Sequence, residues 1–99
     1  MILYHATTAK GAERILKYGF MSGSFTDDIS YASTYLRPSG VILVADIPES
    51  MIRSRGEGYD EWVLRRSVKL PLPGEMFRVA FKGHFLELLE RVKRRKYDE

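Results

Sequence analysis

Three separated positions in this 99-residue chain carry side chains that can do chemistry. His5 ends a short apolar run, the polar segment 24–27 follows a glycine, and Glu61 precedes another apolar run. A histidine exchanges protons near neutral pH, and a fixed carboxylate stabilises positive charge that develops in a transition state. Each position falls at the edge of an extended segment, where α+β proteins commonly build clefts. We therefore expect His5, Ser24 and Glu61 to meet in one open groove.

Several familiar signatures of function are missing from the sequence. It contains no glycine-rich phosphate loop, no pair of histidines at metal-ligand spacing and no glycine-flanked nucleophilic serine. Cysteine is absent, which excludes disulfides and thiolate metal sites. We therefore predict no metal centre.

The composition, with 44% hydrophobic and 29% charged residues, is that of an ordinary globular protein. The length allows one domain, 1–99. Asparagine and glutamine are absent as well as cysteine, which together with the many charged residues indicates a thermophilic source. No apolar run is long enough to cross a membrane and no signal peptide is evident, so we expect a cytoplasmic protein without a membrane partner.

The apolar spacing predicts five strands and three helices in the order β-α-β-α-β-β-β-α, an α+β fold. The predicted strands are residues 2–6, a short extended piece within 20–26, 41–47, 61–70 and 77–81. The run 41–47 is apolar on both faces and is predicted to be the central strand. The polar segment 53–60 is predicted to be an exposed, mobile loop.

Turn and capping residues set the ends of the first two helices. Thr7 or Thr8 is expected to cap the first helix and Gly19 to end it. Asp27 or Asp28 is expected to cap the second, whose buried stripe would be Ile29, Ala32, Tyr35 and Leu36. The third helix begins after Gly83–His84.

Three short blocks, in order, resemble the ADP-ribosyltransferase superfamily, which includes poly(ADP-ribose) polymerases, diphtheria-like toxins and RNA 2′-phosphotransferases. The block 4–7 (Tyr-His-Ala-Thr) is similar to its His-Gly-Ser/Thr opening. The block 23–28, followed by Ala-Ser-Thr-Tyr at 32–35, resembles its second block, and 60–64 (Asp-Glu-Trp-Val-Leu) resembles its third. The resemblance covers most of the chain and implies a split, strongly bent β-structure that grips NAD.

By this resemblance, NAD is the substrate and the reaction transfers ADP-ribose to a protein or nucleic-acid acceptor. His5 would bind the adenosine-side ribose hydroxyl, the Ala6 backbone would hold the nicotinamide carboxamide, and the Thr7 hydroxyl would support that contact. Glu61 would be the catalytic carboxylate. Because Ser24 stands where the polymerases place a stacking tyrosine, the nicotinamide would stack on another ring, and the candidates are Phe25, Tyr31 and Tyr35.

Plainer interpretations remain open for each residue. His5 alone is typical of a surface histidine, Ser24 to Asp28 of a helix cap, and Tyr31 with Tyr35 of a core pair one turn apart. Glu61 alone is typical of a solvated residue beside arginines. All of these interpretations must hold together for the NAD interpretation to fail.

Two other functions compete with the transferase hypothesis. In an RNA-acting enzyme, a nuclease or a 2′-phosphotransferase, His5 and His84 would form an acid–base pair, with an arginine from Arg53, Arg55 or Arg65 stabilising the phosphorane. In a non-catalytic nucleotide- or nucleic-acid-binding module, the basic tail would contact phosphates without reading sequence. The tail residues are Arg91, Lys93, Arg94, Arg95 and Lys96. A solvated helix end is the simpler interpretation of the tail.

Overall fold

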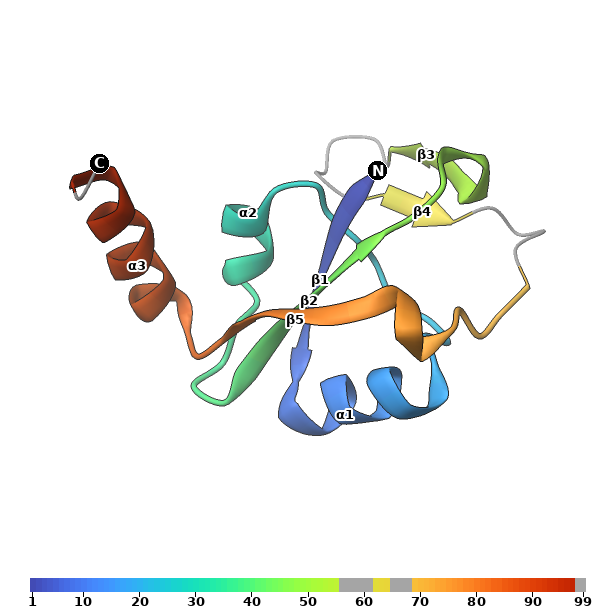
Figure 1. Cartoon of the computed structure of the whole chain (residues 1–99), viewed down its shortest axis with the longest axis horizontal. Coiled ribbons are helices and arrows are strands. Elements are labelled where there is room, and N and C mark those ends of the chain that lie inside the picture. The colour runs from blue at the N-terminus through green and yellow to red at the C-terminus, as the bar shows by residue number, and fades with distance from the viewer. Residues whose placement is uncertain (56–61, 65–68, 98–99) are drawn as a thin grey trace.

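A computed structural model describes residues 1–55, 62–64 and 69–97 of the chain (Figure 1). Its strands are β1 (Ile2–Thr8), β2 (Gly40–Asp46), β3 (Ile52–Arg55), β4 (Trp62–Leu64) and β5 (Phe77–Lys82). Its α-helices are α1 (Ala9–Tyr18), α2 (Ile29–Ser33) and α3 (Phe85–Tyr97), and short 3₁₀ turns cover Glu49–Met51 and Gly74–Met76. The predicted α+β class is confirmed.

The strand β2 is the centre of a three-stranded antiparallel sheet with the order β1-β2-β5. All but the last of its residues are buried, as its apolar character on both faces predicts. Leu43 and Ala45 face one side, which α1 covers through Ala12. Ile42 faces the other side, which α2 covers through Ala32. Both helices therefore pack on the strand pair that carries His5.

A register shift in the β2–β5 pairing reverses which face of the sheet the side chains at the end of β5 point to. Ile42 pairs with Phe81 and Leu43 with Val79, so one residue of β5 is extra at this point. As a result, Phe77 packs on the α1 side of the sheet and Phe81 on the α2 side. The alternation of apolar residues in this strand predicts that Phe77, Val79 and Phe81 share one face; the register shift makes that prediction wrong, and Val79 is 41% exposed.

An extended piece at residues 25–26 joins the main sheet to the two-stranded β3–β4 sheet. The backbone of Thr26 pairs with Tyr4 on the outer edge of β1, and the backbone of Phe25 accepts a hydrogen bond of 2.7 Å from Trp62 N on β4. The order across the molecule, from the strand pairing, is therefore β5-β2-β1, then 25–26, then β4-β3. This piece forms the wall next to His5.

Two expectations about the segments near the second sheet need correction. Residues 53–55 form part of β3 rather than a loop, while 56–60 lie outside the described residues. The strand expected over 61–70 is described only at Trp62–Leu64, and Leu70 is 44% exposed beyond it. A short 3₁₀ turn at Glu49–Met51 lies directly before β3.

The caps of α1 are the predicted residues. The Thr8 hydroxyl accepts a 3.0 Å hydrogen bond from Gly11 N, and Gly19, at φ 95°, ends the helix. In α2, Asp28 rather than Asp27 is the cap, since its carboxylate accepts a 2.8 Å hydrogen bond from Ser30 N. The helix α2 is short, and Tyr35 lies after it with 59% exposure rather than in the buried stripe.

Replacing Asp28 with Ala is expected to lower the free energy of unfolding by about 1 kcal/mol, because a helix donor loses its cap. The matched control is Asp27→Ala, which removes a neighbouring exposed carboxylate that makes no cap bond, and should change stability by less than about 0.5 kcal/mol. Urea unfolding of both variants measures the difference. Equal losses would show that the Asp28 cap does not stabilise α2.

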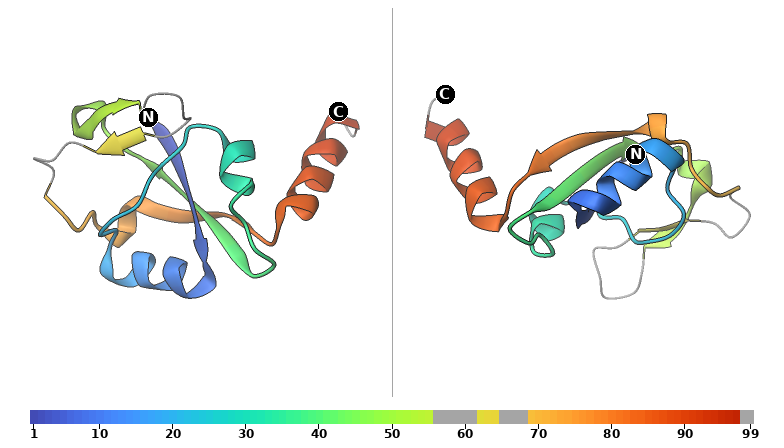
Figure 2. Two further views of the ribbon diagram at one scale, coloured as in Figure 1. Left: turned by 180° about the vertical axis from the view of Figure 1, so that it is seen from behind. Right: turned by 90° about the horizontal axis from the view of Figure 1, so that it is seen from below.

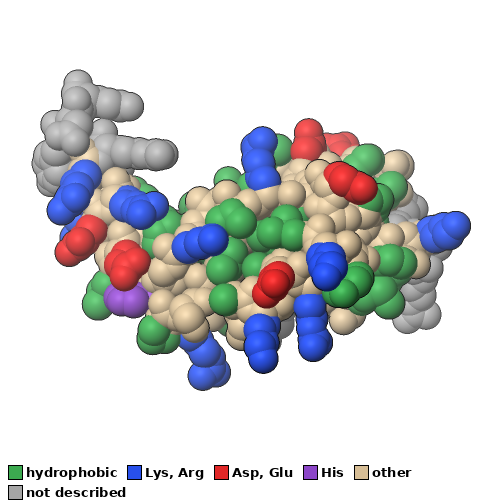
Figure 3. All heavy atoms as spheres, turned by 60° about the horizontal axis from the view of Figure 1, so that its bottom comes forward, with side chains coloured by type: hydrophobic (Ala, Val, Ile, Leu, Met, Phe, Trp, Pro, Cys, Tyr) green, Lys and Arg blue, Asp and Glu red, His purple; other side chains and the backbone are tan. Residues whose placement is uncertain are grey.

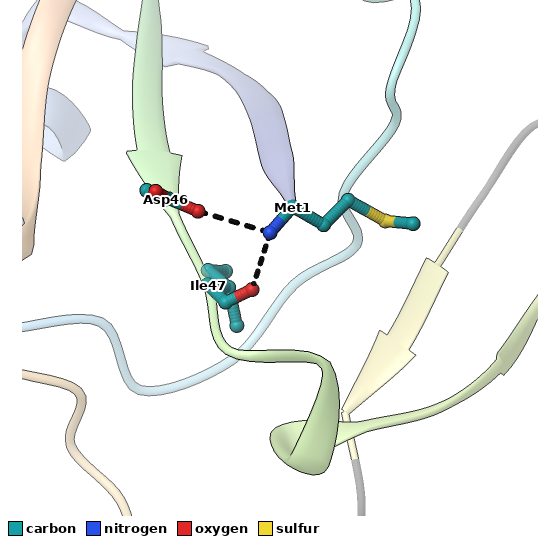
Figure 4. Close-up of polar contacts among 3 residues, drawn as sticks. All are labelled: Met1, Asp46 and Ile47. Carbon is teal, nitrogen blue, oxygen red and sulfur yellow. Dashed lines mark hydrogen bonds and ion pairs between the residues drawn. The ribbon is translucent and has the colours of Figure 1, made fainter.

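Hydrogen bonds from the amino group of Met1 connect the start of β1 to the end of β2. It donates to Asp46 Oδ1 and to the Ile47 carbonyl, both at 2.9 Å (Figure 4). The Asp46 carboxylate is mostly exposed, so the ion pair itself adds little stability. Its effect is to help hold the register of the strand that carries His5.

The helix α3 lies at one end of the molecule (Figure 2), and its buried Leu88 packs with Ile42 and Phe81 of the sheet. Among the helices of the described residues, none is both long enough and apolar enough to span a bilayer.

Candidate functional site

A pocket of about 150 Å³ opens along the outer edge of β1. It is bounded by β1, the extended piece before α2, and α2 with the residues after it. Its lining residues are Tyr4, His5, Ala6, Ser24, Phe25, Thr26, Tyr31, Ala32 and Tyr35. Residues from two distant parts of the chain therefore meet at one place.

The imidazole of His5 is held by a backbone acceptor and an aromatic wall. Its Nδ1 lies 2.8 Å from the Ser24 carbonyl oxygen, which can only accept, so Nδ1 carries the proton. The ring packs against Phe20 and Phe25, with centroids at 5.2 and 5.9 Å. In the neutral ring, Nε2 is then the acceptor nitrogen, and it makes no hydrogen bond within the described residues.

Gly23 lets the chain pass close to His5. Its φ is 137°, and a Cβ placed there would lie 2.8 Å from Cε1 of the His5 ring. A side chain at this position would strain the backbone and also push the imidazole away from Ser24. Gly23 begins the second resembling block, but no structural role was predicted for it from the sequence.

Replacing Gly23 with Ala is therefore expected to displace His5 and to lower the free energy of unfolding by about 1–3 kcal/mol. Nitrogen-15 NMR of the His5 ring should report loss of the fixed Nδ1–H tautomer. The control is Ser22→Ala, an exposed neighbour, which should leave both measurements unchanged. An unaltered His5 signal in Gly23→Ala would contradict this close packing.

The backbone of Ala6 presents a donor and an acceptor at the edge of the pocket. The backbone of Tyr4 exchanges hydrogen bonds of 2.7 and 3.0 Å with that of Thr26, on the side of β1 away from β2. Backbone groups alternate in direction from one strand residue to the next, so the N–H and C=O of Ala6 point to the same side as those of Tyr4. A continued ladder would pair Ala6 with Ser24. Instead, the carbonyl oxygen of Ser24 accepts a hydrogen bond from His5 Nδ1. The Ala6 pair of groups is thus left beside the pocket.

Tyr31 and Tyr35 form the aromatic side of the pocket. Their hydroxyls lie 2.9 Å apart, and their rings meet edge-on at 5.5 Å. Phe25 also lines the pocket, but it is only 1% exposed and packs on Phe20 and Phe77. Of the three candidate stacking rings, the two tyrosines therefore have the more accessible surface, and they are pocket residues rather than a core pair.

The structure brings most of the predicted site residues together. His5, Ala6, Ser24, Phe25, Tyr31 and Tyr35 all line the pocket. Thr7 lies outside it, in a neighbouring hollow that also borders Tyr35. Glu61 lies outside the described residues, so the predicted meeting of His5 with Glu61 stays a prediction.

Three lining residues lie in the quoted blocks but were not predicted as site residues: Tyr4, Thr26 and Ala32. Tyr4 and Thr26 belong because the two backbones pair, which is a long-range contact that no local pattern reveals. Ala32 belonged to the predicted apolar stripe of the second helix, and it lines the pocket as well as packing on the sheet.

The residues of the RNA-enzyme hypothesis are not gathered at this pocket. His84 precedes α3, where its Nε2 lies 3.7 Å from a Glu87 carboxylate oxygen, and it does not line the pocket. Arg53 is exposed on β3. The side chain of Arg55 and the whole of Arg65 lie outside the described residues.

The basic tail forms the second half of α3. Arg91 places its guanidinium carbon 5.2 Å from the centroid of the Phe81 ring, and Lys93 and Arg94 are exposed. The side chains of Arg95 and Lys96 lie outside the described part. Figure 3 shows Lys and Arg side chains spread over one face of the molecule with acidic ones between them, rather than gathered in a single basic patch.

The described residues hold no group of three or more His, Asp or Glu side chains placed to bind a metal ion. In comparisons with known proteins, no family model matches the chain, no curated protein is significantly similar to it in sequence, and no solved structure is significantly similar in fold.

Proposed function

We propose that this protein is an NAD-dependent ADP-ribosyltransferase, which cleaves the bond between nicotinamide and ribose and transfers ADP-ribose to an acceptor. The observation that supports the proposal is the meeting of two separated sequence blocks, 4–6 and 24–35, at one small pocket. Within these ranges, residues 4–6, 24–28 and 32–35 belong to the blocks that resemble the superfamily. The identity of the acceptor, protein or nucleic acid, is left to experiment.

The pocket suits a flat ring that carries a carboxamide. A cavity of ~150 Å³ in another protein holds a benzene-sized molecule, and the volume here is about 150 Å³. The C=O of Ala6 would accept from the carboxamide NH₂, and the N–H of Ala6 would donate to its oxygen. The ring would then lie against the surface of Tyr31 or Tyr35.

The fixed tautomer of His5 supports a second contact. Because the Ser24 carbonyl holds the proton on Nδ1, Nε2 can accept a hydrogen bond from a ribose hydroxyl. This is the role that the resemblance gives to His5, and it needs no change of protonation during the reaction. His5 would orient the substrate rather than transfer a proton.

In the proposed reaction, the C1′–N bond of NAD breaks and its electron pair leaves with nicotinamide, which becomes neutral. The ribose gains positive oxocarbenium character, and the acceptor nucleophile then bonds to C1′ and loses its proton to solvent. A carboxylate near the ribose stabilises this transition state more than the ground state. By the resemblance, that carboxylate is Glu61, which would bind the 2′-hydroxyl of the nicotinamide ribose.

Incubation with NAD labelled in both halves tests the proposal. We expect release of labelled nicotinamide and transfer of labelled ADP-ribose to water, to protein in a cell extract, or to added RNA. Heat-unfolded protein is the control. If NAD binds but no nicotinamide appears with any acceptor, the protein is a non-catalytic binding module. Cleavage of RNA without NAD would instead favour the RNA-acting enzyme.

A further inference from the structure

A second hollow of about 220 Å³ lies beside the pocket. Its lining residues are Thr7, Thr8, Tyr35, Arg37, Ser39 and Gly40. Tyr35 borders both spaces and forms their common wall. The two hollows are therefore neighbours on the same side of the molecule.

The two spaces also follow one another along β1. Residues 4–6 of this strand line the pocket, and residues 7–8 line the hollow. A strand advances about 3.3 Å per residue, so the middle of one space lies about 8 Å along the strand from the middle of the other. A ligand of mononucleotide length can thus reach from the pocket into the hollow.

The chemistry of the hollow differs from that of the pocket. Its lining includes one residue with a guanidinium, Arg37, and three with hydroxyls, Thr7, Thr8 and Ser39, and no residue with a carboxylate. Within the described residues the Arg37 side chain makes no ion pair or hydrogen bond. The Thr8 oxygen accepts from Gly11 N, which leaves its hydroxyl proton free to donate. All of these groups can donate to an anion.

We propose that this hollow binds the phosphate of a nucleotide whose ring occupies the pocket, with Arg37 as its principal contact. A guanidinium binds phosphate oxygens in a bidentate manner, and the three hydroxyls would complete the donor set. The claim that the hollow binds a phosphate depends only on the residues of the hollow. The claim that the ring in the pocket is nicotinamide rests on the proposed function.

The test compares two ligands that differ only in a phosphate, nicotinamide riboside and nicotinamide mononucleotide, by calorimetric titration of the full chain. In Arg37→Met, the affinity for the mononucleotide should fall about tenfold or more, while the affinity for the riboside stays unchanged. Arg37→Lys should recover part of the loss, because it keeps the charge but loses the bidentate geometry. Arg14→Met removes an exposed guanidinium from α1 and should change neither affinity.

Inorganic pyrophosphate separates a failure of this inference from a failure of the proposed function. In wild-type protein it should shift the amide NMR signals of Thr7, Thr8 and Ser39, and in Arg37→Met it should not. If pyrophosphate shifts these signals only in wild type and neither nicotinamide ligand binds, the anion site is supported and the proposed NAD function is contradicted. Equal binding of pyrophosphate or mononucleotide to wild type and Arg37→Met, or equal weakening of the riboside and mononucleotide, would overturn the inference.

Discussion

Replacing Glu61 with Gln is expected to slow nicotinamide release by on the order of 10²-fold, with NAD affinity nearly unchanged. Glutamine keeps the shape of the side chain and one hydrogen-bonding oxygen, but it removes the negative charge. In the proposed reaction that charge faces an oxocarbenium that exists only in the transition state, so its loss affects the rate far more than the binding of substrate.

Rates at saturating NAD and a separate binding titration measure the two effects. The control is Glu49→Gln, which neutralises an exposed carboxylate in the 3₁₀ turn before β3 and should leave both quantities unchanged. If Glu61→Gln releases nicotinamide at the wild-type rate, Glu61 is not the catalytic carboxylate. If NAD affinity falls as much as the rate, Glu61 acts in binding rather than in catalysis.

Replacing Phe20 with Ala is expected to lower the free energy of unfolding by about 3–5 kcal/mol. Phe20 is 1% exposed, and its ring lies 4.7 Å from that of Phe25 and 5.8 Å from that of Phe77. Its backbone exchanges two hydrogen bonds of 2.9 Å with Leu72. The alanine variant keeps these backbone bonds and leaves a cavity at the centre of the aromatic cluster.

Chemical denaturation of Phe20→Ala and Phe20→Leu gives the size of the loss, and the leucine variant remains measurable if the alanine variant does not fold. Tyr18→Ala, which truncates a ring 68% exposed two residues earlier, is the matched control and should cost less than about 1 kcal/mol. Because the Phe20 ring also contacts His5, Phe20→Leu should alter the His5 NMR signal. A Phe20→Ala loss as small as that of Tyr18→Ala would contradict the described core.

Short stretches of sequence predicted a strand or a helix end correctly where few other structures are compatible with those residue types. The all-apolar run before Asp46 indicated a central strand, because only burial on both faces explains it. Thr8 and Gly19 were recognisable as helix ends because a cap hydroxyl and a positive-φ glycine are local requirements. These features depend on a few neighbouring residues, which a sequence displays directly.

Features that depend on pairing between distant strands were not predictable. The extra residue near Val79 sends Phe81 to the opposite face from Phe77, and nothing in the alternation of β5 reveals it. The extended piece at 25–26 was expected, but its place between Tyr4 and Trp62 follows only from the tertiary fold.

The candidate site was predicted only in part, because some of its residues meet only through contacts between distant parts of the chain. Its pocket residues come from blocks that carry a resemblance, so their types could be recognised before the pocket was seen. The place of Arg37 depends on where the chain turns after α2 and meets the end of β1. The resemblance therefore indicated the residues of the pocket, and the hollow beside it was not predicted.

The central claim is that the pocket at the edge of β1 binds the nicotinamide end of NAD, and amide NMR during an NAD titration tests it most directly. The account predicts that the signals of Ala6, Ser24 and Ala32 move together and saturate, while that of Glu13 on the opposite face of the sheet stays still. Nicotinamide alone should move the same three signals. Saturating NAD that leaves Ala6 and Ser24 unmoved, or that shifts only residues around Glu13, would contradict the account.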